Sequence, residues 1–409
     1  MTNYKKRLAS FAVFVFVAAS GAGAKHYAQA TGLKADAGKY PVFELDTTWP
    51  PPLPNQWVFG LVSKISVDQH DNVWIIHRPR SVPPEKTSAP PVVEFDATGK
   101  FVQAWGGDGA GYDWPGNEHN IFVDHKDRVW ISGTAAGARG DDMILEFTTD
   151  GKFVKELGGR NTTHGNKDTV NVNRPGDLWV SPKTDELYVA DGYGNSRVIV
   201  YDAETLAFKR MWGAFGKPPQ EGFNTGNSGE PGEAPTGGRT RGAAPALDTE
   251  GPGSPTFASP VHSVLVSNDD IVYVCDRSNR RVQLFTPDGK YLMQFFLNRA
   301  GPAGGSAVGL AFSRDKEQRF LYVGDYGNSH IAVVDRKKLD ILYQFGKRGP
   351  EPGNFQGTHH IATDSKGNLY VAEVAPGARA QRFLLKGTSS MVPPNALTAA
   401  DLDPKPPKP

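Results

Sequence analysis

The segment LWVSPKTDELYVADGYGNSRVIVYD (178–202) shows the unit from which this chain is built. A short apolar stretch leads into a polar turn, and a stretch of alternating apolar and polar residues follows. Alternation with period two, in a stretch rich in β-branched and aromatic residues, is typical of a β-strand. The segment therefore predicts two consecutive strands joined by a tight turn.

The same phrase occurs six times along the chain. Its copies are ISVDQHDNVWII (65–76), IFVDHKDRVWIS (121–132), LWVSPKTDELYVAD (178–191), VLVSNDDIVYVCD (264–276), LAFSRDKEQRFLYVGD (310–325) and IATDSKGNLYVAE (361–373). A second pair of strands follows most copies, with turn sequences such as the P-D-G of VQLFTPDGKYLMQFF. Six units of about four strands predict an all-β fold, a six-bladed β-propeller.

The propeller is expected to cover residues 41–387. Its last unit is one strand short, because only QRFLLKG (381–387) follows the sixth copy. We expect PVFELD (41–46) to supply the missing strand and close the ring. Residues 217–257 are rich in Gly and Pro and predict a long insertion loop, and 388–409 form a Pro-rich tail that is expected to add nothing to the core.

The N-terminus has the composition of an export signal. Lys5, Lys6 and Arg7 precede an apolar run from Leu8 to Ala19, and small residues follow it. Residues 1–30 are thus expected to be a signal peptide and leader, with cleavage after Ala24 or Ala30; an uncleaved anchor is the alternative. No later segment is long and apolar enough to span a bilayer. The mature protein is expected to be periplasmic or secreted.

Composition limits the classes of partner. Lys and Arg total 45 and Asp and Glu total 44 among the 409 residues, so the formal charge of +1 argues against a nucleic-acid binder that relies on bulk charge. The one cysteine, Cys275, excludes an intrachain disulfide and a cysteine-cluster metal site. A small-molecule or peptide substrate remains, and no protein partner is identified.

One position of the repeat alternates in a way that indicates chemistry. It lies five residues before the end of the first strand of each copy, and its six occupants are Ser63, His119, Gly176, His262, Val308 and His359. Histidine therefore occupies the second, fourth and sixth copies. Equivalent positions of alternate blades are related by a pseudo-threefold axis along the central channel. The three imidazoles are expected to converge there, in the arrangement of a catalytic Zn²⁺ site with an open coordination position.

Several phrases resemble the NHL repeat family, and further phrases resemble one enzyme family of that fold. LYVADGYGNSRVIVYD (187–202) is similar to the NHL phrase, as are VYVCDRSNRRVQLF (272–285) and LYVGDYGNSHIAVVD (321–335). The phrases EHNIFVD, VHSVLVS and THHIATD, with DGYGNSR between the first two, resemble peptidyl-α-hydroxyglycine α-amidating lyase, a six-bladed propeller with zinc held by three histidines.

The resemblance implies roles for particular residues. His119, His262 and His359 are the implied metal ligands, and Tyr193 in DGYGNSR is the implied catalytic tyrosine. Arg78, in an H-R pair, and Arg277, in a D-R pair, are the implied catalytic arginines. The implied reaction cleaves a C–N bond of an α-hydroxyglycine-like substrate, giving an amide and glyoxylate. Such roles are chemically reasonable, because the metal would acidify a hydroxyl, a tyrosinate would take its proton, and arginines would bind a carboxylate and a carbonyl.

The sequence departs from that family at one informative place. The family often binds a structural calcium through a carboxylate just after the third histidine, whereas this chain has His360 there. Neutral imidazole is a poor calcium ligand, so Ca²⁺ is not expected. His360 is instead open to two interpretations, as an extra metal ligand or as a base.

Two other functions are consistent with the same fold. One is a non-catalytic NHL propeller that binds a protein or a glycan on one face. The other is a metal-dependent hydrolase or lactonase, although such propellers favour carboxylate and Asn ligands and no matching acidic alternation occurs here. The fold alone does not choose among the three functions.

Overall fold

The computed structural model describes residues 40–221, 250–301 and 304–402. The predicted signal peptide and leader (1–30) lie outside these residues, and so does most of the predicted loop at 217–257. Among the described residues, no helix has the length and apolar character needed to cross a membrane.

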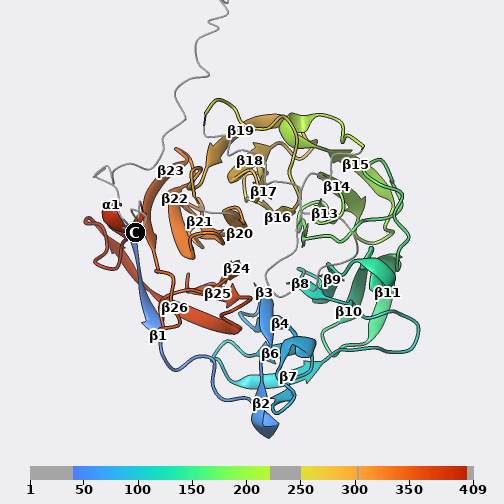
Figure 1. Ribbon diagram of the computed structural model, residues 1–409, viewed down its shortest axis with the longest axis horizontal. Coiled ribbons are helices and arrows are strands. Elements are labelled where there is room, and N and C mark those ends of the chain that lie inside the picture. The colour runs from blue at the N-terminus through green and yellow to red at the C-terminus, as the bar shows by residue number, and fades with distance from the viewer. Residues whose placement is uncertain (1–39, 222–249, 302–303, 403–409) are drawn as a thin grey trace, which may run out of the picture.

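Within the described ranges, the strands form six four-stranded antiparallel sheets arranged as blades around a central axis (Figure 1). Blade one comprises β3 (Leu61–Val67), β4 (Val73–Arg78), β6 (Val92–Phe95) and β7 (Phe101–Trp105). Blade two comprises β8 (Glu118–Val123), β9 (Arg128–Gly133), β10 (Met143–Thr148) and β11 (Phe153–Gly158). Blade three comprises β12 (Asp177–Val180), β13 (Glu186–Asp191), β14 (Arg197–Asp202) and β15 (Phe208–Trp212).

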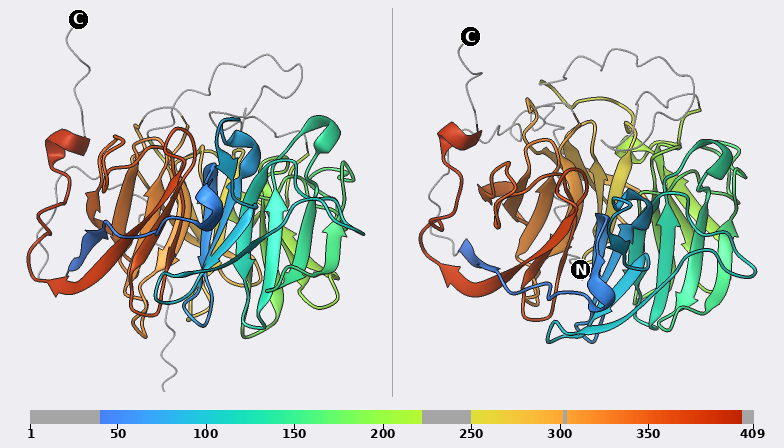
Figure 2. Two further views of the ribbon diagram at one scale, coloured as in Figure 1. Left: turned by 90° about the horizontal axis from the view of Figure 1, so that it is seen from below. Right: turned by 60° about the horizontal axis from the view of Figure 1, so that its bottom comes forward.

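The second half of the ring repeats this pattern. Blade four comprises β16 (Val261–Val266), β17 (Val272–Asp276), β18 (Arg281–Phe285) and β19 (Tyr291–Phe296). Blade five comprises β20 (Ala307–Phe312), β21 (Phe320–Asp325), β22 (His330–Asp335) and β23 (Asp340–Phe345). Blade six comprises β24 (Thr358–Thr363), β25 (Leu369–Glu373), β26 (Arg379–Ser389) and β1 (Tyr40–Asp46). The predicted all-β, six-bladed propeller is confirmed, and the side views show it as a disc (Figure 2).

The remaining elements of the described chain are short. A parallel pair, β2 (Trp57–Val58) and β5 (Thr87–Ser88), lies beside blade one. The helical turns are η2 (Pro54–Gln56), η3 (Pro79–Ser81), η4 (Gly137–Arg139), η5 (Ala214–Gly216) and α1 (Ala399–Leu402).

The ring closes through the strand that the sequence predicts for this purpose. β1 pairs antiparallel with β26, with Leu45 opposite Phe383 and Asp46 opposite Arg382. Phe43 is buried between blades five and six, where its ring lies 5.4 Å from that of Tyr322 and 5.8 Å from that of Phe345. The outermost strand of the last blade therefore comes from the beginning of the described chain.

Alternating side chains build the core between the blades. Each of six apolar clusters lies between two neighbouring blades, for example Trp74 and Ile76 of blade one against Ile121 and Ile131 of blade two. Because each sheet is covered on both faces by its neighbours, the central strands are buried almost throughout. The rigid ring that results holds the six innermost strands side by side around the axis.

The described part of the predicted tail (388–409) differs from the expectation that it adds nothing to the core. Leu397 is 2% exposed, its N–H donates to Gln344 O at 2.7 Å, and Ala396 forms a β-bridge with Phe345. An isolated leucine between Ala396 and Thr398 has no periodicity that a sequence pattern could detect. Backbone pairing with blade five places it in the core instead.

One irregularity recurs at the start of the innermost strands and positions the site. In β3, β8, β16, β20 and β24 the pairing register with the next strand shifts at this place. In β8, for example, Glu118 pairs with Gly133 and Asn120 with Ser132, so His119 is an extra residue outside the ladder. Such a β-bulge redirects side chains and leaves backbone groups without ladder partners.

Candidate metal centre

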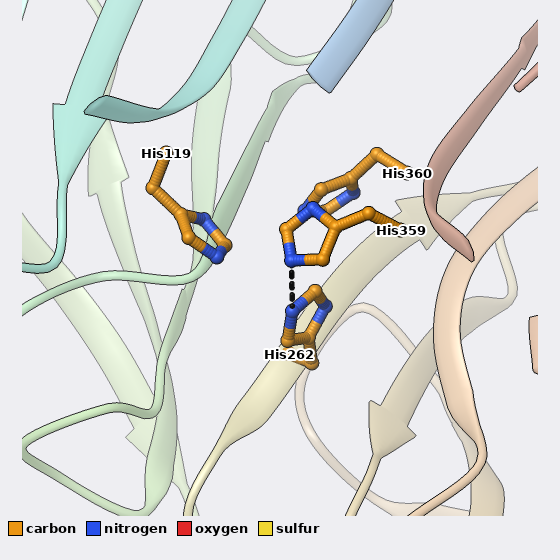
Figure 3. A group of neighbouring side chains, drawn as sticks. All are labelled: His119, His262, His359 and His360. Carbon is orange, nitrogen blue, oxygen red and sulfur yellow. Dashed lines mark hydrogen bonds between the residues drawn. The ribbon is translucent and has the colours of Figure 1, made fainter. Parts of the chain in front are cut away.

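The bulges bring three imidazoles together on the propeller axis. His119, His262 and His359 are the extra residues of β8, β16 and β24, and each is fully buried. Their ring centroids lie 4.7–5.2 Å apart, which is close to an equilateral triangle. Figure 3 shows the rings entering from three separate strands and turning toward one another. These three residues are called the histidine triad below.

The intervening blades orient each ring of the histidine triad. His119 Nδ1 lies 2.8 Å from Gly176 O, His262 Nδ1 contacts Val308 O, and His359 Nδ1 contacts Ser63 O. These acceptors are the backbone carbonyls of the same repeat position in blades three, five and one. A carbonyl oxygen only accepts, so each Nδ1 must carry the hydrogen. In the neutral ring, each Nε2 therefore offers a lone pair toward the axis.

This donor set fits a divalent metal that prefers nitrogen. His262 Nε2 and His359 Nε2 lie 3.1 Å apart, and two lone pairs at that distance repel unless a cation or a proton lies between them. Two Zn–N bonds of about 2.0–2.1 Å at the tetrahedral angle separate the nitrogens by about 3.3 Å. Backbone carbonyls behind metal-bound imidazoles are also the usual way to fix the ring tautomer.

The loop after β13 places Tyr193 against the histidine triad. Its hydroxyl lies 2.9 Å from His119 Nε2, and its ring meets that of His119 edge-on at 4.8 Å. The D-G-Y-x-N-S-R phrase explains this placement, because Asp191 Oδ2 accepts 2.8 Å hydrogen bonds from both Asn195 Nδ2 and Arg197 Nε. Asp191 and Arg197 are both fully buried, so this contact fixes the loop that presents the tyrosine.

The two predicted arginines make different contacts around this centre. Arg277 Nη1 donates to the Tyr193 hydroxyl at 3.3 Å, its Nε donates to Gly304 O at 2.9 Å, and its guanidinium covers the ring of Tyr326. Arg78 Nε donates at 3.0 Å to the backbone oxygen of Glu118, the residue before His119. Both arginines are buried.

A second layer of polar side chains lies one residue further along the innermost strands. Lys64 Nζ donates to Asn120 Oδ1 at 2.6 Å and forms an ion pair with Asp177. Asp177 also accepts from Ser263 Oγ and from the backbone N–H of Val264. Burial lowers the pKa of Lys64, and the Asp177 carboxylate opposes that shift. Lys64, Asn120, Asp177 and Ser263 are called the polar layer below.

His360 stands at the level of the polar layer and belongs to the same cluster as the histidine triad. The ligand nitrogens of the four histidines all lie within 4.8 Å of one another. The ring of His360 is stacked on that of His262 at a centroid distance of 4.9 Å. Figure 3 shows it next to the ring of His359. Burial, aided by the neighbouring imidazoles and Lys64, lowers the pKa of His360 well below its usual range, so its ring is neutral.

The structure thus brings together the predicted residues His119, His262, His359, Tyr193 and Arg277. It places Arg78 against the backbone of Glu118, next to His119. Sequence reasoning missed the polar layer, although a signal existed, since its members each follow one position after the histidine position. It also missed the three orienting carbonyls, because a backbone acceptor leaves no trace in residue type.

Comparisons with known proteins support the fold and the resemblance. No protein-family profile matches the sequence. NHL repeat-containing protein 3 of Mus musculus is 26% identical over 304 residues, covering 72% of this chain and 70% of that protein. A Caenorhabditis elegans protein named as a probable peptidyl-alpha-hydroxyglycine alpha-amidating lyase is 24% identical over 266 residues, covering 63% of this chain and 61% of that protein.

Among solved structures, a virginiamycin B lyase from Staphylococcus aureus covers 84% of this chain and 89% of its own, with 15% identity and a TM-score of 0.45. At this level of similarity nothing about function follows. The blade topology and the sequence relatives carry the conclusion: this chain is a six-bladed β-propeller of the NHL type that resembles the amidating lyases.

Proposed function

We propose that this protein is an exported, zinc-dependent lyase that cleaves the C–N bond of an N-acyl-α-hydroxyglycine. The observation that supports this proposal most is the histidine triad, with each Nδ1 held by a carbonyl and the Nε2 atoms directed at one point beside Tyr193. The resemblance to an amidating lyase supplies the reaction class. Export to the periplasm or the medium is proposed from the sequence of residues 1–30 alone.

His119, His262 and His359 would hold the zinc ion, which supplies Lewis-acid chemistry that makes a substrate hydroxyl easier to deprotonate. The histidine triad is fully buried and Tyr193 is 1% exposed. Charges inside such a site interact strongly because little water screens them.

Tyr193 is the proposed proton acceptor. The Arg277 N–H that points at its oxygen favours the phenolate, since a guanidinium hydrogen bond to a negatively charged oxygen is stronger than one to a neutral phenol. The tyrosinate takes the proton of the substrate hydroxyl, and the hydroxylated carbon becomes the aldehyde carbon of glyoxylate. The electron pair of the breaking C–N bond stays on nitrogen, which takes up a proton to give the primary amide. Atoms and charge then balance, because the hydroxyl proton lost is replaced by the one gained at nitrogen.

The arginines are proposed to position the substrate. A carboxylate next to the reacting carbon suits the planar fork of a guanidinium, which can make two parallel hydrogen bonds to it. Arg277 is proposed for this role because it already contacts Tyr193. Arg78 is proposed to bind the acyl carbonyl or the carboxylate from the blade-one side.

The test is glyoxylate release from a simple N-acyl-α-hydroxyglycine by protein loaded with Zn²⁺. We expect glyoxylate and the amide in equal amounts, and we expect Arg78→Ala to raise KM because it removes a substrate contact. A zinc-loaded protein that releases no glyoxylate would contradict the proposal. Metal binding without turnover would favour the metal-dependent hydrolase, whereas a protein without stoichiometric metal would favour the binding module.

A further inference from the structure

The metal centre has a fourth imidazole that the proposed function does not use. His360 directly follows His359, and its ring centroid lies 4.8 Å from that of His359, 4.9 Å from that of His262 and 5.6 Å from that of His119. It is therefore as close to His359 and His262 as the triad members are to one another, and slightly farther from His119. The ring is 2% exposed, so solvent does not reach it.

The backbone of β24 explains how two adjacent histidines enter one cluster. Thr358 pairs with Glu373 and Ile361 with Val371, so His359 and His360 together face the single residue Ala372. In a regular strand, neighbouring side chains point to opposite faces. The extra residue of the bulge removes that alternation locally, and both rings turn toward the axis.

The Nε2 atom of His360 is buried and has no hydrogen-bond partner. A buried polar atom without a partner costs about 1–3 kcal/mol, so native proteins rarely leave one in that state without a reason. The polar layer does not satisfy this nitrogen, since Lys64 donates to Asn120 and Asp177. The candidate ligand nitrogens of the histidine triad, however, lie within 4.8 Å of the one that His360 offers.

We infer that His360 is a fourth nitrogen ligand, so that the ion is held by four imidazoles. This inference rests on the metal centre of the proposed function and extends it. Four neutral nitrogens and no carboxylate select a first-row transition metal or zinc over calcium, which prefers oxygen. Because neutral imidazoles add no negative charge, an ion held by these four residues would keep its Lewis-acid character.

X-ray absorption spectroscopy of the zinc-loaded wild-type protein counts the ligands directly. We expect outer-shell scattering from four imidazoles in the wild type and from three in His360→Gln. Three imidazoles in the wild type, or equal counts in both proteins, would overturn the inference. A protein that takes up no zinc would overturn it together with the proposed function.

Metal affinity gives a second readout. Competition with a chelator should show that His360→Gln raises the dissociation constant for Zn²⁺ by about tenfold or more. The matched control is His330→Gln, a buried histidine of β22 in blade five outside the cluster, which should leave the constant within about twofold. An unchanged dissociation constant for Zn²⁺ in His360→Gln would contradict the inference. Circular dichroism of the metal-free proteins separates loss of a ligand from loss of the fold.

These outcomes distinguish the two proposals. Four imidazoles in a protein that releases no glyoxylate would leave the ligand assignment in place and remove the lyase. Three imidazoles in a protein that does release glyoxylate would keep the lyase and remove His360 from the ligand set.

Discussion

At the scale of single residues, Tyr193 lies between an acceptor and a cation. Its hydroxyl is 2.9 Å from His119 Nε2 and 3.3 Å from Arg277 Nη1. The contact with His119 requires the phenolic proton, because Tyr193 donates it to Nε2. The contact with Arg277 instead favours loss of that proton, because a guanidinium stabilises a phenolate. A metal bound to the histidine would remove the acceptor and leave the oxygen with the guanidinium, which is the state that a general base requires.

Tyr193→Phe keeps the aromatic contacts of this residue and deletes its oxygen. We expect glyoxylate release by the zinc-loaded enzyme to fall about 10²–10⁴-fold, the usual contribution of general base catalysis, while bound zinc per chain stays unchanged. Steady-state kinetics and elemental analysis on one preparation provide both numbers. Tyr326→Phe is the control, because Tyr326 lies in a similar phrase under the Arg277 guanidinium. Equal losses in the two variants would contradict a special role for Tyr193.

A second residue-scale prediction concerns acid stability. His77 is fully buried, its Nδ1 accepts from Gly60 N–H and its Nε2 contacts Pro90 O, and burial lowers its pKa to about 4. The unfolded chain, with a pKa near 6.5, then binds more protons than the native state as the pH falls. This histidine should therefore lower the free energy of unfolding by about 1–2 kcal/mol between pH 7 and pH 5.

Denaturant unfolding at the two pH values tests this sign. His77→Gln cannot titrate, so its stability should fall less from pH 7 to pH 5 than that of the wild type. His330, whose pKa burial also lowers to about 4, provides an independent second case. A steeper fall of stability in His77→Gln or in His330→Gln than in the wild type would show that the direction is wrong.

At the scale of elements, β1 is the strand that closes the ring. Phe43→Ala should reduce the free energy of unfolding by about 3–5 kcal/mol, because it empties a buried aromatic site between blades five and six. Glu44→Ala, on the exposed side of the same strand, removes only a surface contact with Lys386 and should cost less than about 1 kcal/mol. Similar small losses in both variants would argue against closure by β1.

The loop of Tyr193 is coupled to β16 through a close approach of backbones. A Cβ on Gly192 would lie 2.1 Å from Val261 O and 2.2 Å from Val261 N, directly before His262. Gly192→Ala should therefore displace the start of β16 and weaken zinc binding at least severalfold in a chelator competition. Gly213→Ala, where the nearest atom is 3.3 Å away, is the control. Unchanged affinity in Gly192→Ala would mean that the loop and the strand move independently.

At the scale of the whole molecule, the repeat allowed two features to be predicted from the sequence. These are the six-bladed ring and the placement of histidines on alternate blades. Six copies fix the number of blades, and counting back along each copy places His119, His262 and His359 on alternate blades. The sequence could not predict the backbone irregularities at the start of the innermost strands. The bulges that free Ser63 O and Val308 O, and that turn His359 and His360 to the same side, depend on strand register, which residue type does not encode.

The ligand set and the polar layer show the same limit. Lys64 and Asp177 come from blades one and three and meet only because the ring is closed. A buried lysine is unfavourable without a partner of opposite charge. The partner, Asp177, is far from Lys64 in the sequence and is identified only by the three-dimensional structure. Leu397 entered the core for a similar reason, through one backbone pairing that no periodicity signals.

The central claim is that alternate blades hold one metal ion at the axis, and elemental analysis of purified protein tests it most directly. Wild-type protein should contain about one zinc per chain, and His262→Ala should lose most of it, while His330→Ala should retain it. Absence of stoichiometric metal from the wild type after incubation with Zn²⁺, or equal metal in wild type and His262→Ala, would contradict the claim and leave only the scaffold.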